Sequence, residues 1–320
     1  MAAVAAFGLM EIEKRGVFQR PLWVAVFALA AAVAWGWAYP LIKLGFEEFG
    51  IQQSMTGEKM LFAGVRFTLA GLIVLAIARA TRRNFAVDGV GGWCYIAFYG
   101  FLNTALHYAF FYIGLSNSAG ARAAVLNSSG VFILVLLACL FFKSDRLTLR
   151  KIFGCVLGFT GILALNIGGG ESGAFTLMGD GMIILNALCA AFSGLLTRGL
   201  ARRADVFVAT GYSLAIGGVL LAVPSLLAGA VLPAVTPVGC VILLLLVGIS
   251  TMGFMLYNKL ISCNPVGKVA IFNSLIPVVG ALSSCWCLAE PFYWRYLWAA
   301  LLAMAGIYVI NSGKKDSAKK

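Results

Sequence analysis

Long apolar stretches recur along the whole chain and constrain its fold more than any other feature. Each has about 18 to 25 residues, which at about 1.5 Å of rise per residue lets a helix cross a hydrocarbon layer of about 30 Å. Lipid offers the backbone no hydrogen-bond partners, so such stretches must be helical, and the alternation typical of barrel strands is absent. The sequence therefore predicts an all-α integral membrane protein with ten transmembrane helices, at residues 22–46, 60–80, 91–114, 117–142, 151–168, 181–199, 207–230, 238–258, 267–289 and 293–312.

Little sequence remains for a soluble domain, because 62% of the 320 residues are hydrophobic and only 11% are charged. We expect a cytoplasmic N-terminal segment (1–21), a first group of five helices (22–168), a second group (181–312) and a basic cytoplasmic tail (313–320). The eight cysteines fall mostly inside predicted helices and lack the spacing of a metal site. We interpret them as small apolar side chains and predict no cofactor.

The net charge of +12 is distributed along the chain in a way that indicates membrane topology. Lys and Arg cluster before the first predicted helix, after every second helix and in the tail, so they all fall on one side of the membrane. By the positive-inside rule, both termini are cytoplasmic and the protein lies in the cell membrane, the inner or plasma membrane. Contact with anionic lipid follows from this charge, whereas a nucleic-acid partner does not.

An internal repeat relates the two groups of helices. "DRLTLRKIFGCVLGFTGILALNIG" and "EPFYWRYLWAALLAMAGIYVINSG" share an arginine, glycines and an asparagine at a constant offset of 145 residues. One residue of slip upstream then aligns Asn127-Ser128 with Asn273-Ser274, and Arg122 with Lys268. Five helices repeat once, and because five is odd, the second copy enters the membrane from the opposite side. Two inverted repeats are an architecture of secondary carriers, with sites near the midplane between the halves.

Several motifs carry a resemblance to a known family. They are "AWGWAYPLIKLGF", "VRFTLAGL", "DRLTLRKIFGCVLGFTGILAL" and the long stretch from "NPVGKVAIFNSLIPVVGALSS" to "EPFYWRYLWAALLAMAGIYVI". Over about residues 25–312 the chain resembles the EamA family of the drug/metabolite transporter superfamily. The resemblance implies ten helices, alternating access and export of amino acids or related metabolites. "NSSGVF" stands where the family usually has a proline, so we expect the helix at 117–142 to be less kinked than that at 267–289.

Arg122 is the only charged residue between Ser116 and Phe142. An arginine in an apolar run needs a partner, a water-filled cavity or a route to the surface. We expect Arg122 at the outer mouth of a central cavity and its repeat mate Lys268 at the inner mouth, where each would contact an anionic group on the substrate. The alternative is that both side chains extend to lipid headgroups.

Polar and aromatic residues near mid-membrane are the other candidates for substrate contact, since polar groups at that depth normally face the protein interior. His107 either contacts substrate or carries a proton, or is a neutral side chain bonded between helices. Trp35 and Tyr39 form an aromatic wall or simply pack. The remaining candidates for substrate contact are Asn103, Tyr108, Asn127, Ser193, Tyr257 and Asn273.

Structural or gating roles are expected for Arg66, Pro40, Pro277 and Glu290. Lys43 has Glu47 at i+4, on the same helix face, and we expect these two to pair.

The composition favours some functions over others. No Asp or Glu lies in the middle of a predicted helix, so a carboxylate proton relay lacks its residues. We predict a secondary carrier that exports a small polar metabolite such as an amino acid. A carrier for organic anions, a non-transporting membrane helper and, least favoured, a membrane enzyme are the alternatives. Whether the protein forms a homodimer is a question that the sequence leaves open.

Overall fold

The computed structural model describes residues 16–141, 147–164, 175–264, 269 and 271–312, which form helices and loops and contain no strand. The all-helical expectation is confirmed for this part of the chain. The helices are η1 (Val17–Gln19), α2 (Pro21–Glu48), α3 (Thr56–Ala80), α4 (Gly89–Gly100), η2 (Phe101–Leu106), α5 (His107–Ser116), α6 (Gly120–Asn127), α7 (Ser129–Phe141), α8 (Leu149–Ala164), η3 (Leu177–Gly181), α9 (Met182–Leu200), α10 (Val206–Leu227), α11 (Pro237–Cys263), η4 (Ile271–Ser274), α13 (Leu275–Cys287) and α14 (Trp294–Ser312).

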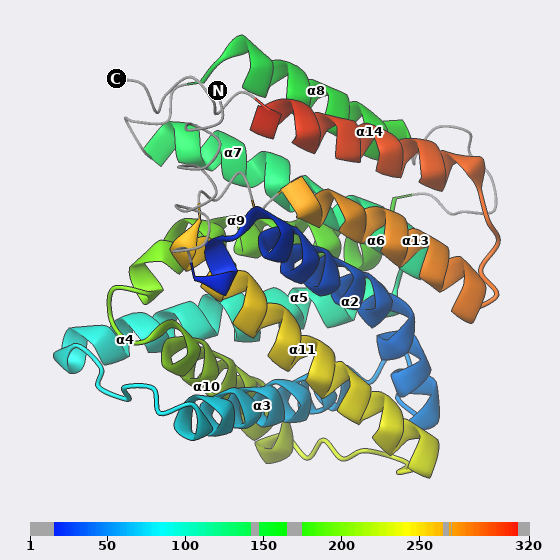
Figure 1. Cartoon of the computed structure of the whole chain (residues 1–320). Coiled ribbons are helices and arrows are strands. Elements are labelled where there is room, and N and C mark those ends of the chain that lie inside the picture. Colours follow the sequence, from blue (N-terminus) through cyan, green and yellow to red (C-terminus); the bar gives the residue numbers. More distant parts are fainter. Residues whose placement is uncertain (1–15, 142–146, 165–174, 265–268, 270, 313–320) are drawn as a thin grey trace, which may run out of the picture.

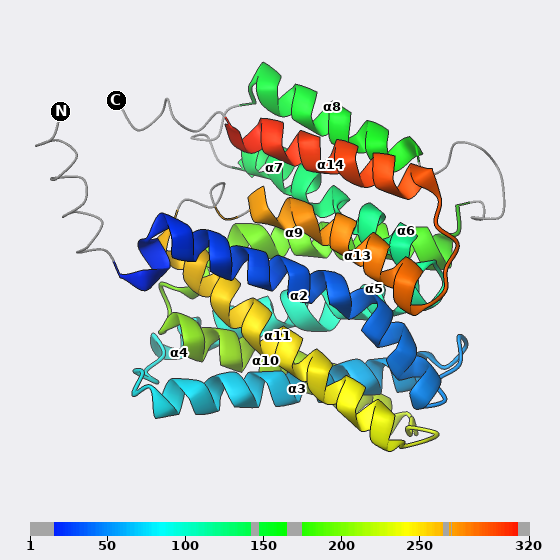
Figure 2. The same cartoon turned by 45° about the vertical axis from the view of Figure 1, so that its right-hand side comes forward.

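The helices form a bundle with two closely packed pairs at opposite edges (Figure 1). α8 lies beside α14 at one edge and α3 beside α10 at the other, and both views show this arrangement (Figure 2). Between them, α2 packs against both α11 and α13, while α9 packs against α5 and α7. The beginning of α2 and the end of α14 lie at the same end of the bundle.

Close helix contacts depend on glycine. A Cβ at Gly64 in α3 would lie 2.5 Å from the backbone nitrogen of Ala222 in α10. Likewise, a Cβ at Gly218 in α10 would lie 2.4 Å from the backbone nitrogen of Thr68 in α3. In lipid, helix association cannot rely on the hydrophobic effect and depends on close van der Waals contact between small residues. Glycine therefore lets the α3 and α10 backbones approach each other.

Six helical segments in the described part of the chain are long and apolar enough to cross a membrane. They are Pro21–Glu48, Thr56–Ala80, Gly120–Phe141, Leu177–Thr197, Val206–Leu227 and Pro237–Cys263, and shorter apolar helices cover Phe272–Cys287 and Trp294–Ile310. The remaining predicted runs also contain helix, in α4 to α5 and in α8.

Several helices are interrupted near their middle. A π-helical turn, η2, separates α4 from α5, and Ser128 separates α6 from α7. Ser128 and its repeat mate Ser274 have the same backbone angles, φ −61° and ψ −18°. In the first half the break forms without a proline and is limited to Ser128, whereas in the second half the 3-10 turn η4 precedes α13. The hydroxyl of Ser128 donates to the carbonyl of Val125 at 2.6 Å, a local bond that competes with regular helix.

Candidate functional site: a cavity at the helix breaks

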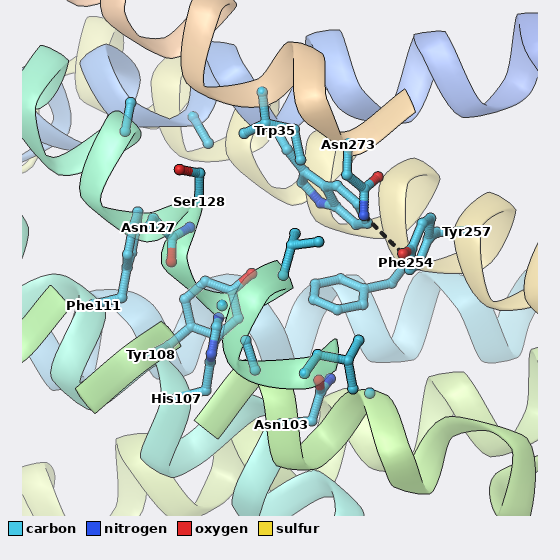
Figure 3. A pocket seen from close by; sticks show the side chains of 18 of the residues that line it. Trp35, Asn103, His107, Tyr108, Phe111, Asn127, Ser128, Phe254, Tyr257 and Asn273 are labelled. Carbon is cyan, nitrogen blue, oxygen red and sulfur yellow. Dashed lines mark hydrogen bonds between the residues drawn. The ribbon is translucent and has the colours of Figure 1, made fainter. Parts of the chain in front are cut away.

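A cavity of about 240 Å³ lies inside the bundle where the interrupted helices meet (Figure 3). Residues of both halves of the chain line it, from α2 to α7 and from α9, α11, η4 and α13. Among the described residues of its wall, Arg66 is the only arginine or lysine and there is no carboxylate. The other side chains are mainly aromatic, aliphatic or amide, so the cavity suits a small molecule bound by shape and by uncharged hydrogen-bonding groups.

Most of the residues singled out from the sequence meet in this cavity. Its wall contains Trp35, Tyr39, Arg66, Asn103, His107, Tyr108, Asn127, Tyr257, Asn273 and Pro277. They come from helices far apart in the chain, as Figure 3 shows for the labelled side chains.

The π-helical turn η2 shapes one side of the wall, since Asn103 lies within it and His107 directly follows it. Single π turns are frequent at functional sites, where the extra residue redirects side chains. The Nδ1 atom of His107 lies 3.1 Å from the carbonyl oxygen of Asn186 in α9. A carbonyl only accepts, so Nδ1 carries the hydrogen in this bond and holds the ring against the second half of the chain.

Two asparagines and a tyrosine form a chain of hydrogen bonds across the halves. Asn186 Nδ2 donates to Asn127 Oδ1 at 2.6 Å, and Asn127 Nδ2 donates to the hydroxyl of Tyr39 at 2.8 Å. This chain joins α9, α6 and α2 at the break before Ser128. Because Tyr39 accepts in this bond, its own hydroxyl hydrogen points elsewhere.

The opposite wall is aromatic and ends in an amide. Asn273 Nδ2 donates to the hydroxyl of Tyr257 at 2.7 Å, drawn as a dashed line in Figure 3. Trp35 meets Tyr257 and Phe254 edge-on, with ring centroids 5.1 and 5.6 Å apart. Asn273 Oδ1 and, across the cavity, Asn103 Nδ2 are buried with no hydrogen-bond partner among the described residues. Buried polar atoms are normally satisfied, so a bound molecule would supply the missing partners.

Arg66 is buried, with 1% of its surface exposed, and bonds three helices together. Its Nε donates to the Leu246 carbonyl at 3.2 Å and to the Ser250 hydroxyl at 2.8 Å, both in α11, and a terminal nitrogen donates to the Tyr112 hydroxyl at 2.9 Å. These bonds fit the structural role expected for Arg66. Its charge also reaches the cavity wall.

Other residues singled out from the sequence lie outside the cavity wall. Ser193 is buried in α9 and donates to the carbonyl of Cys189 in its own helix at 2.8 Å. Pro40 lies within α2, which continues through it to Glu48. Lys268 lies outside the described residues.

Arg122 is not among the wall residues and has a carboxylate partner. Its Nε and one terminal nitrogen donate to the two oxygens of Asp180 at 2.7 and 2.8 Å, and the two side chains are 3% and 2% exposed. Of the three environments considered for this arginine, the structure shows a partner. Asp180 directly precedes the predicted helix at 181–199, and nothing in the sequence links it to Arg122, 58 residues away.

The expected pair of Lys43 with Glu47 is replaced by a contact across the halves. Lys43 Nζ lies 2.9 Å from Glu290 Oε1. Backbone N–H groups of Gly120 and Ala121 also donate to the Glu290 carboxylate, so it is held by three donors, of which Lys43 is one. An i+4 ion pair on a helix surface contributes only about 0.5 kcal/mol. The charge-assisted contact of Lys43 with the fixed Glu290 carboxylate is therefore the more favourable of the two.

Some wall residues were not identified from the sequence, above all Tyr99, Phe111 and Phe254. Tyr99 and Phe111 stand at four-residue intervals in one series with Asn103 and His107, so the helix face that carries the polar residues also carries these aromatics. That spacing is the signal that would have found them.

Interrupted helices around a central cavity in an apolar bundle are typical of secondary transporters. Fold and site together therefore define a membrane transport protein. The model of the EamA-like transporter family matches the chain twice, at residues 22–167 and 177–312. The chain belongs to this family, as the resemblance in its motifs implied, and is a multi-pass membrane protein. Membership in a transporter family also agrees with the expectation that it is not an enzyme.

Curated relatives and a solved structure agree with this assignment. The chain is 23% identical over 288 residues to the "Uncharacterized transporter YvbV" of Bacillus subtilis, covering 88% of this chain and 90% of that protein. It is 25% identical over 295 residues to a "Probable amino-acid metabolite efflux pump" of Salmonella typhimurium, covering 88% and 92%. A solved crystal structure superposes with a TM-score of 0.67 at 17% identity, covering 89% and 94%, which shows a shared fold.

Proposed function

We propose that this protein is a secondary carrier that exports a small polar metabolite, such as an amino acid, by alternating access through the cavity at the helix breaks. The observation that carries the proposal is the composition of the cavity wall. Residues of both halves meet there around unpartnered amide atoms of Asn103 and Asn273. A site shared by two halves is exposed to one side or the other as the halves move against each other.

In this proposal the chain crosses the membrane ten times as two inverted five-helix repeats. Both termini are cytoplasmic, and the membrane is the inner or plasma membrane of the cell. Two observations support it. The family model matches each half once. The beginning of α2 and the end of α14 also share one end of the bundle, and α3, whose last turn contains Arg79, ends there too.

The wall also bears on which substrates the cavity accepts. Without a carboxylate among its described residues, the wall has no partner for an organic cation, whereas Arg66 supplies a positive field. Asn127, Asn103 and Asn273 provide both donors and acceptors, and the aromatic rings provide apolar surface. This combination suits a neutral or zwitterionic molecule with an apolar body. The name given to the Salmonella relative, an amino-acid metabolite efflux pump, supports the same substrate class.

Counterflow in proteoliposomes tests the proposal directly. Vesicles that contain the purified protein are loaded with one pool of unlabelled compounds and then exposed to a trace of the labelled compound outside. We expect accumulation with neutral amino acids. Accumulation only with dicarboxylates or phosphate esters would make the protein an organic-anion carrier instead. No accumulation with either pool, from folded protein, would contradict the carrier function. A variant with Asn127→Ala, which removes the amide from the cavity wall, serves as the reference for binding-site loss.

A further inference from the structure

The first turn of α6 is tied to the second half of the chain at three successive residues. The backbone N–H groups of Gly120 and Ala121 donate to the two carboxylate oxygens of Glu290 at 2.8 and 3.2 Å. The next residue, Arg122, forms the buried ion pair with Asp180. Glu290 follows α13 and Asp180 lies in η3, so both partners belong to the second family match, at residues 177–312.

Close packing accompanies these bonds. A Cβ at Gly120 would lie 2.6 Å from the Ser284 hydroxyl oxygen, and a Cβ at Gly280 would lie 2.7 Å from the Cβ of Ala124. Gly120 and Ala124 belong to α6, and their partners belong to α13. The two short helices therefore touch along their length without room for another methyl group.

The same short helix also reaches the cavity. α6 has eight residues, and Ala124 and Asn127 at its other end line the cavity wall. From Ala121 to Asn127 the helix rises only about 9 Å. None of the residues that tie the first turn of α6 to the second half lines the cavity. In the other direction the wall extends to Thr197 and Ile261, close to the ends of α9 and α11.

We propose that the first turn of α6 is the outer gate of the carrier, and that Glu290 and Asp180 are positioning residues that hold this gate closed. The inference rests on the carrier function and topology proposed above. Outward opening requires α6 to leave α13 and Asp180, and the break at Ser128 lets α6 move without carrying α7 along. Because Asn127 ends the same helix, a molecule bound to its amide acts directly on the element that opens.

The ion pairs at the other end of the bundle are of a different kind. There Arg203 pairs with Asp88 at 3.0 Å, with side chains 41% and 66% exposed. Exposed pairs contribute little and exchange easily with water, whereas breaking a buried pair is strongly unfavourable. The outer side is therefore held more firmly than the inner side.

A reversible disulfide tests the gate. A Cβ at Gly120 would lie 3.0 Å from the Cβ of Ser284, close to the separation of about 3.5 to 4.5 Å that a disulfide needs. In a background without the native cysteines, we expect Gly120→Cys/Ser284→Cys to lose counterflow of labelled neutral amino acids when oxidised and to regain it with reductant. Ser284→Cys alone, which adds no side chain at Gly120, is the matched control. Full counterflow by the completely cross-linked protein would overturn the inference.

A labelling experiment decides the same question without transport. Val131→Cys places a thiol on the cavity wall, and a membrane-impermeant maleimide is added outside right-side-out vesicles. We expect Val131→Cys alone to be labelled slowly. Adding Asp180→Asn or Glu290→Gln should raise the labelling rate about tenfold or more, since the closed state loses a contact that holds the first turn of α6. Asp88→Asn is the control and should change nothing. Unchanged labelling in both gate variants would overturn the gate, whereas a wild-type protein inactive in counterflow would overturn only the carrier function.

Discussion

Asp180→Asn should destabilise the protein far more than the loss of any surface ion pair. The substitution keeps the shape of the side chain and removes its charge. The guanidinium of Arg122 then stays in an environment where 3% of its side chain is exposed, and it loses the charge of the Asp180 carboxylate. Breaking a buried pair by removing one partner costs about 3 to 5 kcal/mol.

The magnitude follows from the geometry of the pair. At 2.7 Å, an effective dielectric constant of about 20 gives an attraction of about 6 kcal/mol, and much of it offsets the desolvation of the two charges. The amide oxygen that this substitution introduces would still accept one hydrogen bond from Arg122, so we expect a loss near the lower end of the range, about 3 kcal/mol. Replacing both partners, Arg122→Met with Asp180→Leu, should recover most of this loss because both charges of the buried pair are removed together.

Reversible unfolding in mixed micelles of SDS and a mild detergent measures these differences as free energies of unfolding. Asp88→Asn is the matched control, since it removes the same charge from the exposed pair with Arg203 and should cost at most about 1 kcal/mol. Equal stability of Asp180→Asn and Asp88→Asn would refute the reasoning. So would a double variant less stable than Asp180→Asn alone.

Three further predictions concern the packing and the topology. Arg66→Lys loses the guanidinium fork that bonds α11 and α5, so it should lower the free energy of unfolding by about 2 kcal/mol or more. A change below about 0.5 kcal/mol in the same unfolding assay would contradict the structural role of Arg66. Gly64→Ala should also destabilise, because its Cβ would lie 2.5 Å from the backbone of Ala222, and an unchanged unfolding midpoint would show that α3 and α10 can separate freely. Val231→Cys should react with an impermeant maleimide added to intact cells, whereas Arg203→Cys should react only after permeabilisation, and the reverse pattern would overturn the proposed orientation.

Hydropathy alone predicted where helices lie because crossing lipid leaves the backbone no other choice. Their ends were less predictable. The run at 60–80 begins at Thr56 and the run at 238–258 continues to Cys263, since helices extend beyond the apolar core into polar loops. The π turn at Phe101–Leu106 left no mark in the pattern, because it inserts into a stretch whose residues on either side are equally apolar.

The contents of the cavity were predicted in large part from depth and polarity, as with Asn127 and Asn273 at the helix breaks. Polarity alone did not predict whether a side chain points into the cavity. The Ser193 hydroxyl, for example, bonds a carbonyl of its own helix instead. The ion pairs could not be predicted. Arg122 and Asp180 lie 58 residues apart and Lys43 and Glu290 lie 247 apart, and such contacts depend on how the halves pack.

Protection of the cavity by a transported compound shows whether the substrate binds there. Asn103→Cys, in the cysteine-free background, places a thiol on the cavity wall beside His107. The labelling rate from the inner side is measured in inverted vesicles as the concentration of a compound active in counterflow is raised. We predict that labelling slows, with half-protection near the concentration that half-saturates transport by the same variant. A labelling rate unaffected at concentrations that saturate transport would contradict it, because the transported molecule would then bypass the cavity.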